Sequence, residues 1–335
     1  MQDTVSVIIP VLNEELYIKK LIQSLLNQDY DFSLIEVIFV DGDSKDNTVE
    51  IINNELERKS IDYKIITNKE RITPKSVNMG IKSARNDIII RIDAHSEYPK
   101  NYISKCVYYL NNTDADNVGC LFDTKSEGII GNSIAEVLTS KFGVGNSKFR
   151  TNAQSGYVDS VPYGTFRRSL FEKIGYFNEE LIRSEDNEIN YRIIKNGGKV
   201  YLFNDISIIY HPRNTIRKLL KMAYDNGKWS IYTSYFIPGS MKLRHLIPFL
   251  FVLSLLIGLI ICLLNIKVLK IMFLCEIGLY LLLDLIFSFK NIKSGILHCV
   301  LCFIIYPLFH IAYGIGSIAG IGKTIKKKVK KSGER

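Results

Sequence analysis

The sequence predicts an α/β domain built around a parallel sheet and followed by a region of membrane helices. Two observations support this expectation. Between residues 5 and 93, short β-branched runs alternate with segments of helical spacing, which is the pattern of parallel strands joined by crossover helices. Beyond residue 245 the chain becomes apolar, and Leu246–Leu264 contains no charged residue over a length that spans a bilayer.

Four strands are expected in the first part of the chain: Val5–Pro10, Ile35–Val40, Tyr63–Ile66 and Ile88–Ile92. Each of the first three strands precedes a helix, because apolar residues then recur at helical spacing as far as residues 26, 56 and 84. Asn13 is a candidate N-cap of the first helix, and the Thr73–Pro74 pair is a start signal for the third.

The signals weaken after residue 111, although several elements are still recognisable. Ser133–Leu138 has the composition of a helix, and Val158–Phe166 has that of a strand. A further helix is expected to begin after Ser184 with an acidic first turn and to end at Gly197. The strand Val200–Phe203 follows, and a basic helical segment ends near the chain's single tryptophan.

Acidic residues stand where two of the predicted strands end, at Asp41 and Asp93, and Asn13–Glu14 follows the first strand. In open α/β sheets, ligands bind beyond the carboxyl ends of the strands. Asp93 and His95 would point to the same side, because side chains alternate along a strand. Such a rim suits a nucleotide, whose ribose and base need hydrogen-bond acceptors and whose diphosphate needs a cation. Equally open is a plain reading, in which Asp93 caps a turn and His95 is a loop residue.

Other nucleotide-binding classes are not supported. The chain has neither a glycine-rich dinucleotide motif after its first strand nor a P-loop motif. Arg71 precedes the start of the third helix, where it would reach an anion, although a solvated arginine fits the pattern equally well. The acids at residues 185–188 are consistent either with ordinary helix capping or with a general base, Asp186, that faces the rim.

The composition is basic, with a net charge of +9 and a pI of about 9.0 over 335 residues. The basic residues are not interleaved with aromatic ones as on an RNA-binding face, so no nucleic-acid partner is expected. They crowd residues 323–331, where a polybasic segment favours anionic lipid head groups, unless it is simply a solvated tail. The six cysteines suggest packing rather than disulfides or a metal site. The N-terminus enters a strand at once, which predicts no signal peptide and a cytoplasmic domain.

Three apolar stretches, Leu246–Leu264, Ile271–Phe289 and Ser294–Ile318, are candidate membrane helices. The second contains Glu276 and Asp284, which indicates a protein-facing or water-facing side, or a soluble core helix instead of a span. The positive charges around residue 243 and at the C-terminus all favour the cytoplasmic side, which conflicts with an odd number of spans. The predicted domains are therefore 1–235, a membrane region 236–322 of two to three helices, and a basic cytoplasmic tail 323–335.

The motifs together resemble family 2 glycosyltransferases. The resemblance rests on Val7–Glu14, Val40–Thr48, the triplet Asp93–His95 and the pair Glu185–Asp186, in that order along residues 4–230. Within the family, the sequence is most similar to the membrane-attached bacterial exopolysaccharide subgroup. The resemblance implies a GT-A fold, a Rossmann-type nucleotide-diphospho-sugar transferase domain, and inverting transfer from a nucleotide-diphosphate sugar.

The resemblance also implies roles for individual residues. The residues assigned to the donor are Pro10, Asn13, Glu14, Asp41, Asp43, Arg71 and Asp93. Those assigned to a Mg or Mn ion are Asp93 and His95, with His95 in place of the family's last acid. From its place after the run Ile206–Tyr210, His211 is a further candidate metal or phosphate contact, although a loop histidine fits equally well. Asp186 is assigned as the base, and Glu185 and Trp229 are assigned to the acceptor. Processive synthases carry Gln-x-x-Arg-Trp near residue 229, and here only the tryptophan and a basic residue remain.

The expected activity is that of a cell-membrane glycosyltransferase with a cytoplasmic catalytic domain. It would move a sugar from a nucleotide-diphosphate donor to a lipid-linked saccharide in exopolysaccharide or capsule synthesis. Two alternatives remain open at this stage: transfer to a polyprenyl phosphate, and a catalytically dead scaffold that binds nucleotide sugars.

Overall fold

The computed structural model describes residues 3–264 and 266–333, with side chains up to residue 329. The chain forms two compact units. Unit 1 contains Met1–Asp123 and Asn152–His211, and unit 2 contains Thr124–Thr151 and Pro212–Arg335. The predicted boundaries at residues 235 and 322 remain predictions, and residues 334 and 335 of the predicted tail lie outside the described part.

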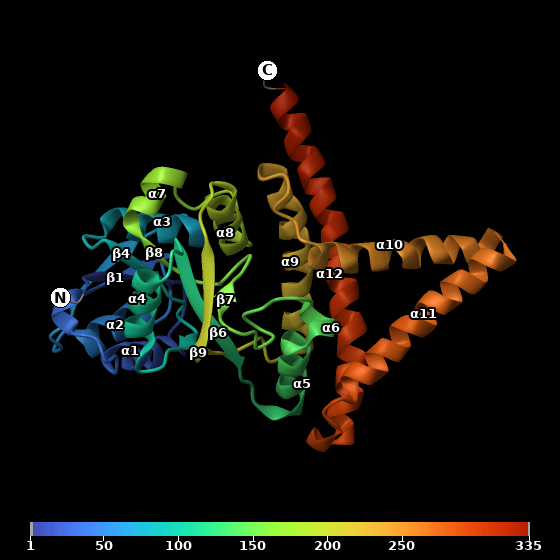
Figure 1. Cartoon of the computed structure of the whole chain (residues 1–335), viewed down its shortest axis with the longest axis horizontal. Coiled ribbons are helices and arrows are strands. Elements are labelled where there is room, and N and C mark those ends of the chain that lie inside the picture. The colour runs from blue at the N-terminus through green and yellow to red at the C-terminus, as the bar shows by residue number, and fades with distance from the viewer. Residues whose placement is uncertain (1–2, 265, 334–335) are drawn as a thin grey trace. The chain divides into compact units, whose positions relative to one another are not determined.

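Unit 1 is built on a nine-stranded mixed sheet (Figure 1). Its strands are β1 (Val5–Val11), β2 (Ile35–Asp41), β3 (Asp62–Thr67), β4 (Ile88–Arg91), β5 (Ser96–Glu97), β6 (Asn117–Thr124), β7 (Gly156–Tyr157), β8 (Thr165–Arg167) and β9 (Val200–Tyr210). Their order is β3-β2-β1-β4-β8-β6-β9-β5, and β7 pairs with β9. Its helices are α1 (Ile18–Leu26), α2 (Thr48–Leu56), α3 (Thr73–Ser83), α4 (Tyr102–Asn112), α7 (Arg168–Ile174) and α8 (Glu185–Lys195), together with the short 3-10 helix η1 (Phe32–Leu34).

The predicted parallel half of the sheet is confirmed. β1 pairs in parallel with β2 and β4, and β2 pairs in parallel with β3. Every residue of β2 and β4 is buried, which explains why these strands have continuous apolar runs instead of alternation. Because the four strands point the same way, the loops that follow β1, β2 and β4 meet at one edge of the sheet.

Three local expectations were wrong. Asn13 does not cap the first helix, because α1 begins only at Ile18 and the residue before it is Tyr17. Most of the expected strand Val158–Phe166 is irregular, and only β8 forms at its end, because β8 completes a ladder between β4 and β6. Ser184 does precede α8, but its side chain makes no capping hydrogen bond, since its backbone is left-handed with φ 65°.

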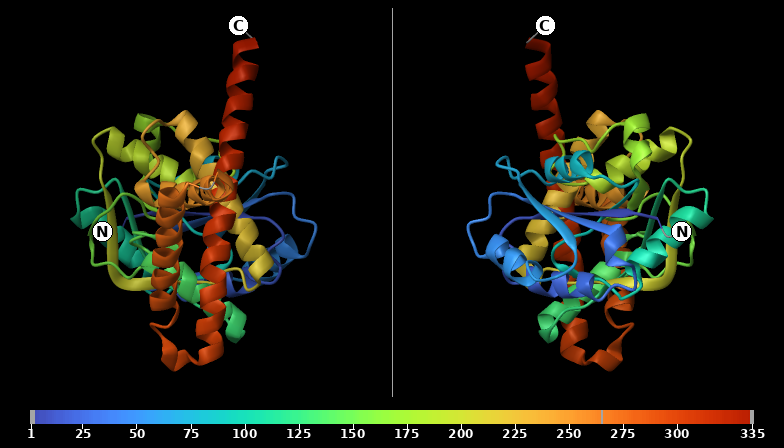
Figure 2. Two further views of the ribbon diagram at one scale, coloured as in Figure 1. Left: turned by 90° about the vertical axis from the view of Figure 1, so that its right-hand side faces the viewer. Right: turned by 90° about the vertical axis from the view of Figure 1, so that its left-hand side faces the viewer.

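Unit 2 is helical (Figures 1 and 2). Its helices are α5 (Gly128–Thr139), α6 (Lys141–Val144), α9 (Ile216–Phe236), α10 (Leu243–Leu264), α11 (Lys267–Ser288) and α12 (Ile296–Gly333), with the 3-10 helix η2 (Ile292–Ser294). Its buried core joins α5, α9 and α12 through residues such as Val137, Leu219 and Tyr306. In the described part of the chain, three helices (α10, α11 and most of α12) are long and apolar enough to cross a membrane.

Candidate active site

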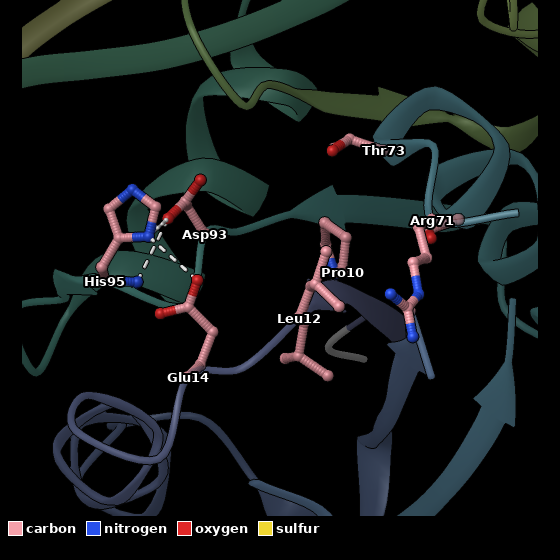
Figure 3. Close-up of a pocket in the computed structure, with 10 residues that line it drawn as sticks. Pro10, Leu12, Glu14, Arg71, Thr73, Asp93 and His95 are labelled. Atoms are coloured by element: carbon pink, nitrogen blue, oxygen red, sulfur yellow. Dashed lines mark hydrogen bonds and ion pairs between the residues drawn. The ribbon is translucent and has the colours of Figure 1, made fainter. Parts of the chain in front are cut away.

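The segments after β1, β2, β3 and β4 line a cavity of about 110 Å³ in unit 1 (Figure 3). Its lining residues are Pro10, Val11, Leu12, Glu14, Gly42, Arg71, Thr73, Ser76, Asp93 and His95. Five of them, at positions 10, 14, 71, 93 and 95, are residues that the sequence assigned to the donor or to a metal. The parallel strands explain this convergence, because each places the residue after its last rung at the same edge.

An imidazole lies between two carboxylates at one end of the cavity. His95 Nδ1 is 2.9 Å from Asp93 Oδ1 and 3.5 Å from Glu14 Oε1, as the dashed lines in Figure 3 show. Burial alone would lower the pKa of His95, but the carboxylates of Asp93 and Glu14 raise it to about 11. Burial likewise opposes ionisation of Asp93, and His95 nevertheless lowers the pKa of Asp93 below its usual value. The cluster therefore holds a charged imidazolium between two carboxylates.

Asn13 and Asp41 are joined by one hydroxyl group. The Ser44 hydroxyl donates to Asp41 Oδ1 at 2.6 Å and accepts from the Asn13 amide at 2.9 Å. The Asn13 side chain in turn accepts from the Lys45 amide at 2.8 Å. These bonds hold the loops after β1 and β2 against each other. Asp41 itself is buried, and its neighbour Gly42 lines the cavity.

Arg71 and Asp43 form an ion pair beside the same cavity. Arg71 Nη2 lies 2.9 Å from Asp43 Oδ2, and both residues have left-handed backbones with φ near 58°. In Figure 3, Arg71 lies on the side of Pro10 and Leu12 that is away from His95. The cavity thus has a guanidinium at one end and the acid–imidazole cluster at the other.

Arg91 is a site residue that the sequence reasoning did not single out. Its guanidinium bonds to Asp186 through Nη1 and to Glu185 through Nη2, the latter at 3.0 Å. The side chain is only 4% exposed and lies over the rings of Tyr163 and Phe177. It connects the start of α8 to β4, two residues before Asp93. The sequence does contain an indication of this role, because Arg91 is the single charged residue inside the apolar run Ile88–Ile92.

The pKa of Asp186 reflects two opposing effects. Burial raises the pKa to about 7, and the nearby Arg91 guanidinium limits that rise. The same interaction raises the pKa of Arg91 above its already high value. Asp186 is therefore a carboxyl group that changes protonation near neutral pH.

The two remaining predicted residues lie elsewhere. His211 Nε2 is 2.8 Å from Glu97 Oε1, and within the described residues it is not part of the cavity lining. Trp229 belongs to unit 2, where it is buried and has Lys323 Nζ 3.5 Å from its ring centroid. Their assignments to a metal and to an acceptor stay predictions.

Strained backbone accompanies the site. Among the described residues, six that are not glycine have a positive φ: Asn13, Asp43, Arg71, Asn152, Tyr163 and Ser184. Asn13, Asp43 and Arg71 are predicted site residues, and Ser184 directly precedes Glu185. The backbone amide of Tyr163 donates a hydrogen bond to Asp186. Such conformations cost about 1–3 kcal/mol each and persist where the surrounding structure holds them.

Asp93 and His95 offer part of the ligand set that a divalent cation needs. Within residues 3–264 and 266–333 there is no cluster of three or more acidic, histidine or cysteine residues that could hold a metal alone. Asp93 and His95 nevertheless present an oxygen and a nitrogen donor side by side, which suits Mn better than Mg. These residues fit an ion whose remaining ligands come from a bound diphosphate and water.

Comparison with known sequences identifies the family. Residues 6–175, just over half of the chain, match the sequence profile of glycosyl transferase family 2. The chain is 30% identical over 224 residues to the succinoglycan biosynthesis protein ExoA of Rhizobium meliloti, covering 66% of this chain and 67% of that protein. It is 29% identical over 231 residues to a Methanococcus voltae dolichyl N-acetyl-α-D-glucosaminyl phosphate diacetamido-dideoxy-glucuronosyltransferase, covering 67% and 71%.

Solved structures share the fold. The mannosyltransferase PcManGT of Pyrobaculum calidifontis, in complex with GDP-Man and Mn²⁺, aligns with a TM-score of 0.56 at 15% identity, covering 98% of this chain and 88% of that one. S. aureus TarS in complex with UDP-GlcNAc aligns with a TM-score of 0.52 at 17% identity, covering 96% and 92%. The predicted GT-A fold is confirmed, and the chain belongs to glycosyltransferase family 2 and is a sugar-transferring enzyme.

Proposed function

We propose that this enzyme is an inverting glycosyltransferase that moves a sugar from a nucleotide-diphosphate donor to a lipid-linked saccharide at the cytoplasmic face of a cell membrane. The product would enter an exopolysaccharide or capsule. The observation that carries the proposal is the cavity at the carboxyl edge of the parallel strands, with Arg71, Glu14, Asp93 and His95 around it.

The donor would bind in this cavity. Glu14 and Arg71 line it, and they would supply an acceptor for the nucleoside and positive charge for phosphate oxygens. Asn13 and Asp41 are not among the lining residues; their side chains accept hydrogen bonds from Lys45 and Ser44, respectively, and would offer their remaining acceptor capacity to the nucleoside. The complexes of PcManGT with GDP-Man and of TarS with UDP-GlcNAc support a nucleotide-sugar donor. A divalent cation held by Asp93 and His95 would neutralise charge on the departing diphosphate. His95 would first have to release the proton that Asp93 and Glu14 now stabilise.

Asp186 would act as the general base. Inversion needs a carboxylate that removes the acceptor's hydroxyl proton on the face of the sugar opposite the leaving group. A pKa of about 7 suits this role, because a base is most effective when its pKa lies near the working pH. Arg91 would hold Asp186 in place, and Glu185 beside it would contact the acceptor.

A lipid-linked acceptor is favoured by the apolar helices of unit 2 and by the relatives. The Methanococcus voltae relative is named for a dolichyl-phosphate-linked sugar acceptor, and the Rhizobium meliloti relative for succinoglycan synthesis. Three apolar helices of sufficient length keep such a chain beside its lipid substrate.

The test uses purified full-length protein in membranes with Mn²⁺ and a panel of nucleotide sugars, and it measures release of the nucleoside diphosphate. We expect turnover with lipid-linked saccharide, and Asp186→Asn should lower kcat about 10²- to 10⁴-fold while donor binding is unchanged. The control is Asp87→Asn, whose side chain is 88% exposed, and it should leave kcat unchanged.

Each alternative has its own outcome. Turnover with bare polyprenyl phosphate, together with no turnover with the lipid-linked saccharide, would show that the acceptor is polyprenyl phosphate and not the proposed saccharide. Full activity in Asp186→Asn would remove Asp186 from the mechanism. Donor binding without turnover by the unmodified protein, under all metals and acceptors, would indicate a scaffold.

A further inference from the structure

The three apolar helices of unit 2 differ in how much protein covers them. In the most apolar 18-residue window of α10, and likewise of α11, 11% of the residues are buried. The corresponding share for α12 is 44%. Almost the whole surface of α10 and of α11 is therefore free of contacts with the rest of the protein, whereas α12 has one side packed against protein.

The covered side of α12 is packed closely on α9. Gly316 leaves no room for a Cβ atom, which would collide with the carbonyl oxygen of Tyr224, and Gly320 meets the carbonyl oxygen of Lys228 in the same way. From the other helix, Gly227 faces the carbonyl oxygen of Tyr313. These glycines bring the two backbones together, so α9 and this part of α12 lie at the same depth in any membrane.

That depth cannot be the hydrocarbon core, because α9 is strongly charged. From its beginning to the glycine contact at residues 224–228, its charged residues are Arg217, Lys218, Lys221, Asp225 and Lys228. Charged side chains are costly at the bilayer centre and are rare there. Near the beginning of α12, His298 bonds to Ser133 of α5, a helix that also carries Glu136. The packing of α12 thus connects it along its length to helices that carry charged side chains, several on α9 and one, Glu136, on α5.

The uncovered side of α12 is apolar. Its exposed large apolar residues include a series at intervals of three, four and seven: Leu297, Val300, Ile304, Leu308, Ile315, Ile318 and Ile321. This spacing places them on one face of the helix. From residue 296 to residue 322 the sequence has no acidic or basic residue apart from two histidines. A helix with protein on one side and an apolar stripe on the other suits the surface of a bilayer.

In the α10–α11 pair, polar residues face protein, and the outward surface between the ends of the helices is apolar. Polar residues of α11 recur every four positions and face protein: Glu276 bonds to Ser254 of α10, Tyr280 lies 2.9 Å from His310 of α12, and Asp284 is buried beside Ser288. Apart from Lys267 at the start of α11, the large exposed residues of both helices are apolar. Each helix has 22 residues, about 33 Å at the usual rise, which matches a hydrocarbon core of about 30 Å.

The hairpin starts and ends at α12. The Gly314 backbone of α12 is close to Pro248 near the beginning of α10, and η2 links the end of α11 to the beginning of α12. Figure 1 shows α10 leaving the middle of α12 and α11 returning to its beginning. Positive charges lie at the beginning of α10, at Lys242 and Arg244, and follow α11 at Lys290 and Lys293, whereas Lys267 and Lys270 lie at the opposite end of the hairpin.

We propose that α10 and α11 cross the bilayer as a two-helix hairpin, and that α12 does not cross it but lies along the membrane surface with its apolar stripe toward lipid. An even number of spans then places the charges near residue 243 and the C-terminal lysines on one side. The proposal concerns the lipid bilayer as the partner of unit 2 and is independent of the transfer reaction.

The decisive measurement is the side on which the C-terminus lies. Full-length protein with a tag at each end is treated with protease in inverted vesicles and in spheroplasts. We expect both tags to be digested in inverted vesicles and both to be protected in spheroplasts. A C-terminal tag that is digested only from outside would show three spans and overturn the proposal.

A second measurement tests whether the hairpin crosses. In a background of Cys262→Ser and Cys275→Ser, the variants Lys267→Cys and Lys293→Cys are labelled with an impermeant maleimide. Position 267 should react only from outside and position 293 only from inside. Reaction of position 267 from the cytoplasmic side would show a re-entrant hairpin and would also overturn the proposal.

A third measurement tests the surface position of α12. The double variant Ile304→Lys and Ile315→Lys should stay within two-fold of the unmodified protein in membrane content, because lysines at a surface extend into the head groups. The matched variant Leu256→Lys and Leu259→Lys in α10 should lose membrane content at least ten-fold. Equal large losses in both variants would show that α12 is a span.

Discussion

At the scale of single residues, Arg91 is the residue that connects the parts of the site. Its charge is buried inside a strand whose other residues are isoleucines, and its two partners come from α8. A buried cation with two carboxylates is tolerated only because every member has a charged partner. The position of Asp186 therefore depends on a residue of β4, the strand that also leads to Asp93.

The substitution Arg91→Met is expected to destabilise the protein by about 3–5 kcal/mol, because it leaves two carboxylates without their buried partner. The measurement is thermal or denaturant unfolding of the purified protein, and Arg91→Lys should recover part of the loss. Lys199→Met is the control, since Lys199 pairs at the surface with Asp114 and should change stability by less than about 1 kcal/mol. Equal losses in the two variants would contradict the role of Arg91.

The pH dependence of kcat should follow the protonation state of Asp186. A general base works only when it is deprotonated, so kcat should rise with pH through the pKa of about 7 and then level off. In Arg91→Lys the cation remains, and the rise should stay near that pH. In Arg91→Met the loss of the cation raises the pKa of Asp186, and the rise should move to higher pH. An unchanged profile in Arg91→Met would argue against coupling of the two residues.

At the scale of elements, the contact between α9 and α12 decides the character of unit 2. Glycines at three places allow the two helix backbones to touch, and the Ser230 hydroxyl lies 2.9 Å from the Tyr313 hydroxyl across the contact. Lys323 of α12 lies over the rings of Trp229 and Tyr232 of α9. Close backbone approach and paired polar groups make this a tight helix–helix contact, of a kind that is found in membranes as well as in water. What favours a surface position is therefore the charge carried by α9, not the contact itself.

Gly316→Ala should destabilise this contact, because its Cβ would collide with the Tyr224 carbonyl oxygen. Overpacking costs about 1–3 kcal/mol, which exceeds the gain of up to about 1 kcal/mol from replacing a helical glycine. The melting temperature in detergent should therefore fall. Gly322→Ala in the same helix has open space around its Cβ and should raise the melting temperature or leave it unchanged. A rise in both variants would show that the contact is looser than described.

At the scale of the whole molecule, the basic charge and the apolar helices would hold the enzyme to a membrane in different ways. Attraction between the C-terminal lysines and anionic lipids is screened by salt, with a Debye length of about 3 Å at 1 M. Burial of apolar helices in lipid is not screened in this way. The net charge of +9 would therefore contribute to the proposed membrane attachment without being required for it.

Membrane pellets of cells that express the full-length protein should accordingly retain it after washing with 1 M salt and after alkaline carbonate. The measurement is the fraction of protein in the pellet against the supernatant. A peripheral protein that is bound through its basic residues, expressed alongside, should be released by the salt wash and serves as the comparison. Release of this protein by salt alone would mean that neither α10 nor α11 is inserted.

The parallel half of the sheet, the acids at its edge and the apolar C-terminal helices could all be determined from the sequence. These features depend on local patterns: β-branched runs, helical spacing and the length of uncharged segments. The family resemblance added the motifs around Asp93 and Asp186. The match of residues 6–175 confirms the family and includes Asp93, but it ends before Asp186, whose role stays a prediction. The antiparallel half was harder to predict, because β5, β7 and β8 have two or three residues each and form only by pairing with distant strands.

Tertiary structure alone decided two further points. The partner of Arg91 lies 95 residues away along the chain, and no local pattern encodes such a distance. Nor does hydropathy distinguish an apolar helix that faces lipid from one that is half covered by protein, since both need apolar residues. Only the packing therefore distinguishes α12 from α10 and α11. The role of the glycines in α12 becomes visible only when they are seen against the carbonyl groups of α9 that they approach.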